Sequence, residues 1–302
     1  MLKRSRLALA MSFSAAVLCG CGGAADSAQP AAQSSSPAAA AKDKRHQFEA
    51  AKADCMKQKG FTYVPYVKPE KQETEQERKL VSGDYQAMRE YREKFGFGIF
   101  SQHVYPKEIG IESLQEGIQA DPNVKLSRRL SRAQYEAYNT AKDACIGVAG
   151  KQVLGVSIKS NIEYIGLFAK AFKRAKAAEL DGDPKLVELS GSMATCLKGK
   201  GYTVSDTKPT ALARRGEDLF MDQLGALGRE QMGDPPGGPK MTKDTREFQM
   251  PELTPQQGKP YLVKEVKAAL DDLECGKDFY AVYVPRETAV KQKINDQYAF
   301  SF

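Results

Sequence analysis

The sequence predicts a mainly helical protein with short β extensions, made of two related helical units that each carry one disulfide. Three observations support this prediction. Apolar residues recur at three- and four-residue spacing in most segments, which is typical of amphipathic helices. A motif around Cys55 returns around Cys196, and cysteines lie far apart along the rest of the chain. The predicted parts are an N-terminal segment (1–20), a linker (21–45), a first unit (46–180) and a second unit (181–302).

The first twenty residues have the pattern of a cleavable export signal. Three basic residues precede an apolar run of twelve residues, 7–18. A membrane-spanning helix needs about 20 apolar residues, whereas the apolar part of a secretory signal has about 7 to 15. The segment is therefore expected to be removed rather than to remain as a membrane span.

The end of this segment resembles the lipobox of bacterial lipoprotein signal peptides. That motif has an aliphatic residue three positions before an invariant Cys and a small residue directly before it, as in Leu18-Cys19-Gly20-Cys21. In that family the peptidase cuts before the acylated Cys. The resemblance thus implies a lipid on Cys21 and an anchor on the extracytoplasmic face of a cell membrane. An ordinary secretory signal cut near Ala24 or Ala25 is the alternative.

The stretch Gly22–Ala41 contains mainly Gly, Ala, Ser, Gln and Pro. Such a composition buries too little apolar surface to offset the entropy lost on ordering, so a disordered tether is expected. About 20 flexible residues reach roughly 25 Å.

Cysteine use is consistent with an oxidising compartment. Once Cys19 is removed and Cys21 is acylated, an even number remains, as Cys55, Cys145, Cys196 and Cys275. Two disulfides are the natural expectation, and four cysteines allow three pairings. No metal site is predicted. The closest two of these cysteines are 51 residues apart, and the chain has only two histidines.

An internal repeat selects one pairing. Residues 55–62 match residues 196–203 at five of eight positions, and the next cysteine follows after 90 residues in the first unit and 79 in the second. If the units are related, Cys55 pairs with Cys145 and Cys196 with Cys275. Each bond then closes a loop within its own unit, and its expected role is structural.

Helices are predicted where apolar periodicity and capping residues coincide, and Ser131 with Gln134 forms a capping box. A short β extension is expected at Thr62–Val67, and Phe279–Val284 reads as non-helical. The region 206–254 is expected to contain long irregular stretches. In the third helix, Ile162, Ile165 and Ala169 are expected to face inward together with the phenylalanines. The predicted helices are His46–Lys59, Asp84–Lys94, Ser131–Cys145, Asn161–Leu180, one from Pro184, Pro260–Leu273 and Pro285–Gln297.

Composition and motifs exclude several functions. The formal net charge is +7, and the first twenty residues carry three of these charges and no acid, so the rest is too weakly basic to indicate nucleic-acid binding. Neither a Gly-x-Ser-x-Gly elbow nor Cys-x-x-Cys-His occurs, and no cofactor or catalytic residue is predicted. One apolar loop is best explained as a buried turn, and it is kept as a binding candidate because its aromatic residues could line a pocket. Its residues are Phe95, Phe97, Ile99 and Phe100.

The body of the chain resembles actinobacterial lipoproteins of uncharacterised activity. The resemblance rests on Cys55–Phe61, on Phe95–Ile99 and on Cys275 followed by a helix. It implies no activity. The sequence favours a non-enzymatic envelope protein that is held at the membrane by its N-terminal lipid and binds an unknown envelope protein or a small ligand. The alternatives are a hydrolase acting on cell-envelope polymers and a purely structural surface protein.

Overall fold

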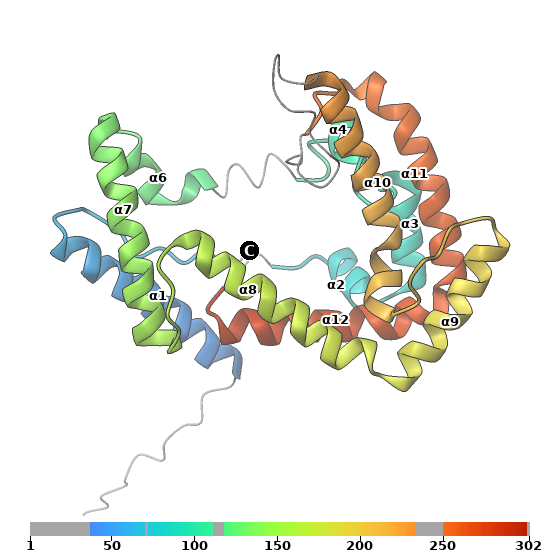
Figure 1. Ribbon diagram of the computed structural model, residues 1–302, viewed down its shortest axis with the longest axis horizontal. Helices are drawn as coiled ribbons and strands as arrows, with labels where there is room; N and C mark the ends of the chain where they lie inside the picture. Colours follow the sequence, from blue (N-terminus) through green and yellow to red (C-terminus); the bar gives the residue numbers. More distant parts are fainter. Residues whose placement is uncertain (1–36, 70–71, 111–117, 233–249, 301–302) are drawn as a thin grey trace, which may run out of the picture. The chain divides into compact units, whose positions relative to one another are not determined.

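The computed structural model describes residues 37–69, 72–110, 118–232 and 250–300, and helices make up the regular structure of this part of the chain (Figure 1). The mainly helical prediction is confirmed. The elements are α1 (Pro37–Gln58), α2 (Glu75–Val81), α3 (Tyr85–Phe95), α4 (Ser101–Val104), α6 (Pro122–Ser127), α7 (Arg132–Ala149), the π-helix η1 (Gly150–Leu154), α8 (Asn161–Lys176), the π-helix η2 (Ala177–Asp181), α9 (Pro184–Gly199), α10 (Pro209–Met232), α11 (Pro255–Cys275) and α12 (Lys277–Gln297).

The short β extensions are a wrong prediction, because the described residues contain no strand. The extended stretch 62–67 has no second strand beside it. Instead, the Asn123 side chain takes the place of a partner: its amide oxygen accepts from the Val64 N–H at 2.9 Å, and its amide nitrogen donates to the Val64 carbonyl at 2.8 Å. A single asparagine thus satisfies backbone groups that a ladder would otherwise pair.

The predicted cysteine pairing is confirmed. Cys55 is bonded to Cys145 and Cys196 to Cys275, with Cα–Cα distances of 5.4 and 5.5 Å. The two motifs also end their helices in the same way. Phe61 N–H donates to the Met56 carbonyl and Tyr202 N–H to the Leu197 carbonyl, each at 3.0 Å. The glycine between, Gly60 or Gly201, has a φ near +85° (82° and 86°), a conformation that ends helices and strongly favours glycine.

The helices that receive these disulfides also begin alike. Ser131 and Gln134 form a capping box at the start of α7, as predicted, and Thr254 and Gln257 form one at the start of α11. In each half, therefore, a glycine-ended helix is joined to a helix with a Ser/Thr-x-x-Gln start. This likeness supports the proposal of two related units, which stays a prediction.

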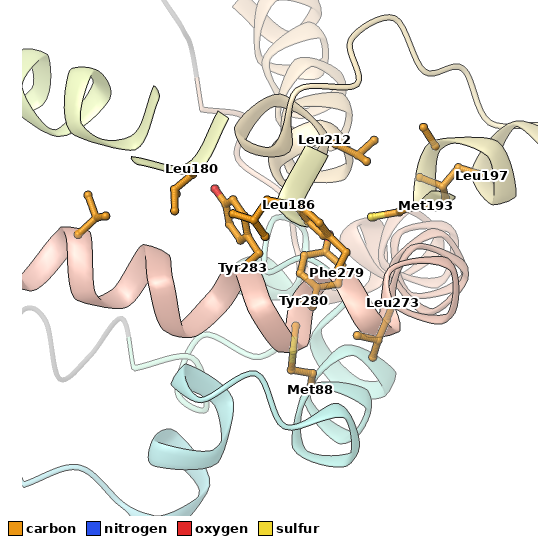
Figure 2. Close-up of a cluster of buried hydrophobic side chains, with 12 residues drawn as sticks. Met88, Leu180, Leu186, Met193, Leu197, Leu212, Leu273, Phe279, Tyr280 and Tyr283 are labelled. Atoms are coloured by element: carbon orange, nitrogen blue, oxygen red, sulfur yellow. The ribbon is translucent and has the colours of Figure 1, made fainter. Parts of the chain in front are cut away.

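Two hydrophobic clusters contain residues from both sides of the predicted boundary at residue 180. Helices α3 and α4, from the first half of the sequence, pack against α11. Figure 2 shows Met88 of α3 in one cluster with Leu273, Phe279, Tyr280 and Tyr283. A separate cluster surrounds the Cys55–Cys145 bond and contains Met56, Tyr138 and Ala141.

Two stretches expected to be irregular or non-helical are helical. Helix α10 occupies Pro209–Met232, within the region predicted to be irregular. Helix α12 begins at Lys277 and continues through Pro285. Its β-prone aromatic residues Phe279, Tyr280 and Tyr283 are 1%, 4% and 1% exposed, so tertiary burial overrides their local preference.

The predicted inward face of α8 is wrong in part. Ile162, Ile165 and Ala169 are exposed, the isoleucines by 81% and 46%, whereas Phe168 is buried as predicted and Tyr164 is buried beside it. Tyr164 stacks on Phe48 of α1 with ring centroids 5.2 Å apart, and Phe168 stacks on Phe300 at 4.3 Å. Aromatic packing across the chain therefore decides which side of α8 faces the core.

The N-terminal predictions fall mostly outside the described residues. Neither the export signal (1–20) nor Cys21 is described, and the same holds for the tether up to residue 36. Helix α1 begins at Pro37, within the stretch expected to be a tether. Among the described helices, none is long and apolar enough to cross a membrane.

Candidate functional site

A concavity of about 640 Å³ lies beside α1, α6 and α7. We call it the α1–α7 pocket. Three tyrosines, three asparagines and four basic residues contribute to its wall. They are Tyr63, Tyr135, Tyr138, Asn123, Asn139, Asn161, Lys52, Arg128, Arg132 and Lys142. This volume falls in the range of small-molecule sites, about 300 to 1,000 Å³.

Tyr138 is the unusual residue of this wall. The residue is 3% exposed, and its hydroxyl has no hydrogen-bond partner among the described residues. A buried hydroxyl without a partner costs about 1 to 3 kcal/mol. Burial raises the pKa of Tyr138, and the nearby Asp121 and Glu49 carboxylates raise it further, so the hydroxyl keeps its proton. The hydroxyl is a donor without an acceptor, and the surrounding atoms shield it from solvent, so a ligand in the pocket would reach it only after neighbouring side chains move.

Glu49 organises the α1 side of the pocket. Its carboxylate accepts from Lys52 at 2.5 Å and from the Tyr63 hydroxyl at 2.9 Å. Lys52 also lies over the Tyr63 ring, 4.9 Å from the centroid. Burial is the main reason that the pKa of Tyr63 is raised far above its ordinary value, with Glu49 adding to the effect. Tyr63 therefore remains neutral and is held in one orientation.

The charge of the wall is positive. Among the described residues, Asp121 is the one carboxylate in the lining, and its Oδ1 already accepts from Asn123 N–H and from the Asn123 amide, both at 2.8 Å. Lys52 is paired with Glu49, and the exposed Arg132 is paired with Glu136. For Arg128 and Lys142 no ion pair is found in the described part of the chain. The wall thus offers cations that an anionic ligand could pair with.

A smaller concavity of about 210 Å³ continues from this pocket. It shares Lys52, Ile146 and Asn161 with the α1–α7 pocket and adds the stacked rings of Phe48 and Tyr164. A ligand in the larger space could therefore extend an apolar group toward these rings.

The predicted aromatic loop has a different environment. Ile99 and Phe100 are 7% and 0% exposed and pack among residues of α10 and α11, while Phe95 and Phe97 are half-buried. The loop backbone surrounds the carboxylate of Glu265: Phe97 and Ile99 N–H groups donate to Oε1, and Phe100 N–H donates to Oε2, each at 2.8 Å.

A β-carbon on Gly96 would lie 2.8 Å from the Glu265 Cγ, so the glycine permits this close approach. The structure therefore places this loop as a buried turn around an internal carboxylate. A binding role for the four loop residues stays a prediction.

A second concavity of about 480 Å³ lies beside α3, α8, α10 and α12. Two carboxylates contribute to its wall, Glu217 and Glu287. Glu287 accepts from Lys176 at 2.8 Å and from the Tyr283 hydroxyl at 3.1 Å. Although part of the Glu217 side chain is exposed, the protein atoms of the concave wall exclude some of the water around its carboxyl group. This desolvation raises the pKa of Glu217.

The four cysteines that were predicted to pair form the two disulfides. The described residues contain no group of His, Cys, Asp and Glu that could hold a metal ion. The α1–α7 pocket residues were not predicted, because they come from α1, α6, α7, the start of α8 and the stretch after α1 and carry no spaced motif. Tyr138 lies at apolar spacing on its helix, and that periodicity gives no sign of a hydroxyl without a partner.

Comparisons of the chain with models of protein families, with curated proteins and with solved structures find no match. Function is therefore inferred from the side chains of the site and from the N-terminal motif.

Proposed function

We propose that this chain is an extracytoplasmic lipoprotein, anchored to a cell membrane through Cys21, that binds a small anionic ligand in the α1–α7 pocket. The single observation that carries the ligand proposal is a tyrosine hydroxyl buried without a partner in a pocket whose unpaired charges are positive. A ligand that bears an acidic group and accepts hydrogen bonds would satisfy both.

The polar, basic and aromatic residues of the pocket lining indicate which chemical class of ligand it would accept. The amides of Asn139 and Asn161 can donate and accept, as the hydroxyl groups of a sugar require, and the tyrosines supply flat apolar faces. Arg128 and Lys142 would pair with a carboxylate or a phosphate. These features support a sugar acid or a sugar phosphate.

Ligand binding is tested by thermal unfolding with two probes, glucuronate and glucose 1-phosphate, and with glucose as the neutral control. A rise in Tm with either anion and not with glucose is expected, because a ligand that binds only the folded state stabilises it. The Arg128→Gln variant should weaken the effect. Arg129→Gln, an exposed neighbour outside the pocket lining, should not. Equal shifts for glucose and the anions would contradict the proposal.

The lipid anchor has a separate test. Mass spectrometry of the protein purified from its own membrane should show an N-terminal peptide that begins at Cys21 and carries acyl chains. The Cys21→Ser variant should lose the acyl mass. A native protein with an unacylated N-terminus would rule the anchor out and leave the ligand proposal intact.

One observation favours a second candidate function, a hydrolase acting on envelope polymers. Glu217 and Glu287 line the same concavity, where the pKa of Glu217 is raised and Glu287 accepts a hydrogen bond from Lys176. Such a pair could act as acid and base. Glu217 would give its proton to the leaving oxygen, and Glu287 would take one from the water that attacks carbon. Hydrolysis of envelope glycans that is lost in Glu217→Gln and retained in Asp218→Asn would support this function.

A further inference from the structure

Helix α8 presents an unusual outer face. Ile162 is 81% exposed, the highest value among the large apolar side chains of the described residues, and Ile165 is 46% exposed. Gly166 and Ala169 lie one and two turns beyond Ile162 on the same face, at the four- and seven-residue spacings that align side chains on a helix. The opposite face is buried through Tyr164 and Phe168 against α1 and the C-terminal segment.

Lys173 continues this face toward the C-terminal end of the helix, and Lys170 and Arg174 lie on its flank at the spacing of about 3.6 residues per turn. Lys170, Lys173 and Arg174 are exposed, and no ion pair is found for them in the described part of the chain. Glu163 is the one acid of α8, and its carboxylate accepts from the Lys159 N–H at 2.8 Å, at the start of the helix. The outer face of α8 therefore combines exposed isoleucines with an uncompensated positive charge.

We propose that this outer face of α8 docks on an anionic lipid surface. Isoleucine side chains that enter the boundary between headgroups and acyl chains gain hydrophobic free energy, and basic residues beside them attract anionic headgroups. Charge complementarity selects the membrane as the occupant. The inference rests on the proposed membrane address of the chain but does not require the acyl chain.

The experiment uses the full chain with Cys21→Ser, so that an acyl group makes no contribution. Co-sedimentation is measured with vesicles of phosphatidylcholine containing phosphatidylglycerol and with vesicles of phosphatidylcholine alone. Binding should be stronger to the anionic vesicles and should weaken as salt rises. Replacing Lys170 and Lys173 by Gln should lower binding about fivefold for each charge removed, and Ile162→Ser should lower it further.

A matched control comes from α11, where Val263 is 62% exposed and lies near the exposed Lys259 and Lys264. The triple variant Val263→Ser, Lys259→Gln, Lys264→Gln makes the same change in charge and a similar change in apolar surface, and it should bind as the parent does. If the two triple variants lose vesicle binding equally, or if the parent binds equally to the two vesicle types, the proposed docking face is wrong.

Size-exclusion chromatography adds a second readout. The Cys21→Ser protein should elute as a monomer, with or without Ile162→Ser. A dimer that Ile162→Ser dissociates would show that a second copy of the chain covers this face, and the lipid proposal would then be wrong. If the protein fails to bind vesicles, the proposed acylation of Cys21 is not contradicted, because mass spectrometry of the native protein tests acylation separately.

Discussion

Arg92 on α3 donates a hydrogen bond of 2.8 Å to Asp272 on α11, although 180 residues separate them in the chain. Both side chains are buried. The same carboxylate accepts from the Tyr280 hydroxyl at 2.6 Å and lies 3.4 Å from Arg215. Asp272 is thus the anion that holds two buried guanidinium groups beside the core of Figure 2.

The first prediction concerns this ion cluster. Asp272→Asn should lower the free energy of unfolding by about 3 to 5 kcal/mol, because it leaves buried cations without an anion. Arg92→Met should cost less, since Asp272 keeps Arg215 and Tyr280. Urea unfolding followed by far-ultraviolet circular dichroism measures both. An Asp272→Asn variant as stable as the parent would show that the cluster contributes little.

The second prediction concerns Glu265, which is 0% exposed. Burial raises its pKa above the ordinary value of 4.5, and the N–H groups of the loop around it oppose the shift. The folded chain therefore holds the proton more tightly than the unfolded chain does. Consequently, the contribution of Glu265 to stability is greatest below about pH 4.5 and decreases as the pH rises through the folded pKa.

The measurement is urea unfolding of the parent and of Glu265→Gln from about pH 4 to about pH 8. The variant should be less stable at every pH, because the Gln amide cannot accept all the loop N–H groups. The difference between the two proteins should shrink as the pH rises. A difference that grows with pH would show that the loop N–H groups outweigh burial.

Features determined by neighbouring residues could be predicted from the sequence. The capping box at Ser131, the glycine ends at Gly60 and Gly201 and the disulfide pairing all follow from short motifs or from their repetition. Features determined by residues far apart in the sequence could not be predicted from it. Phe279–Val284 has β-prone residues and is helical because the core buries it, and α8 is turned by aromatic rings from α1 and the C-terminal segment.

The candidate pocket belongs to the second kind. Lys52, Arg128 and Lys142 lie on or beside three helices, and only the fold brings them to one wall. Asn123 is equally hidden in the sequence, because its partner Val64 is 59 residues away. A single sequence shows no signal that would connect such residues.

The third prediction concerns the two disulfides. Their loops have similar lengths, 90 and 79 residues, so the unfolded chain is restricted to a similar extent by each. Replacing both cysteines of either bond by Ala should therefore lower stability by about 4 kcal/mol. Thermal unfolding of the two double variants measures this. If only one variant loses stability, chain restriction does not explain the effect of the bonds.

The fourth prediction separates a site for a ligand from a merely imperfect core. Tyr138→Phe removes the hydroxyl that has no partner, so the ligand-free protein should become more stable by about 1 kcal/mol. Tyr283→Phe is the control, because its hydroxyl donates to Glu287 at 3.1 Å and its loss should destabilise by a similar amount.

The same pair of variants is then tested with glucuronate and glucose 1-phosphate. If the Tyr138 hydroxyl serves the ligand, Tyr138→Phe should lose part of the rise in Tm that the anions produce, while Tyr283→Phe should keep it. A variant that is more stable without ligand and less responsive to it is expected of a group kept unpaired for binding. If Tyr138→Phe instead destabilises the ligand-free protein, the hydroxyl has a partner in solution, and the observation that carries the ligand proposal is lost.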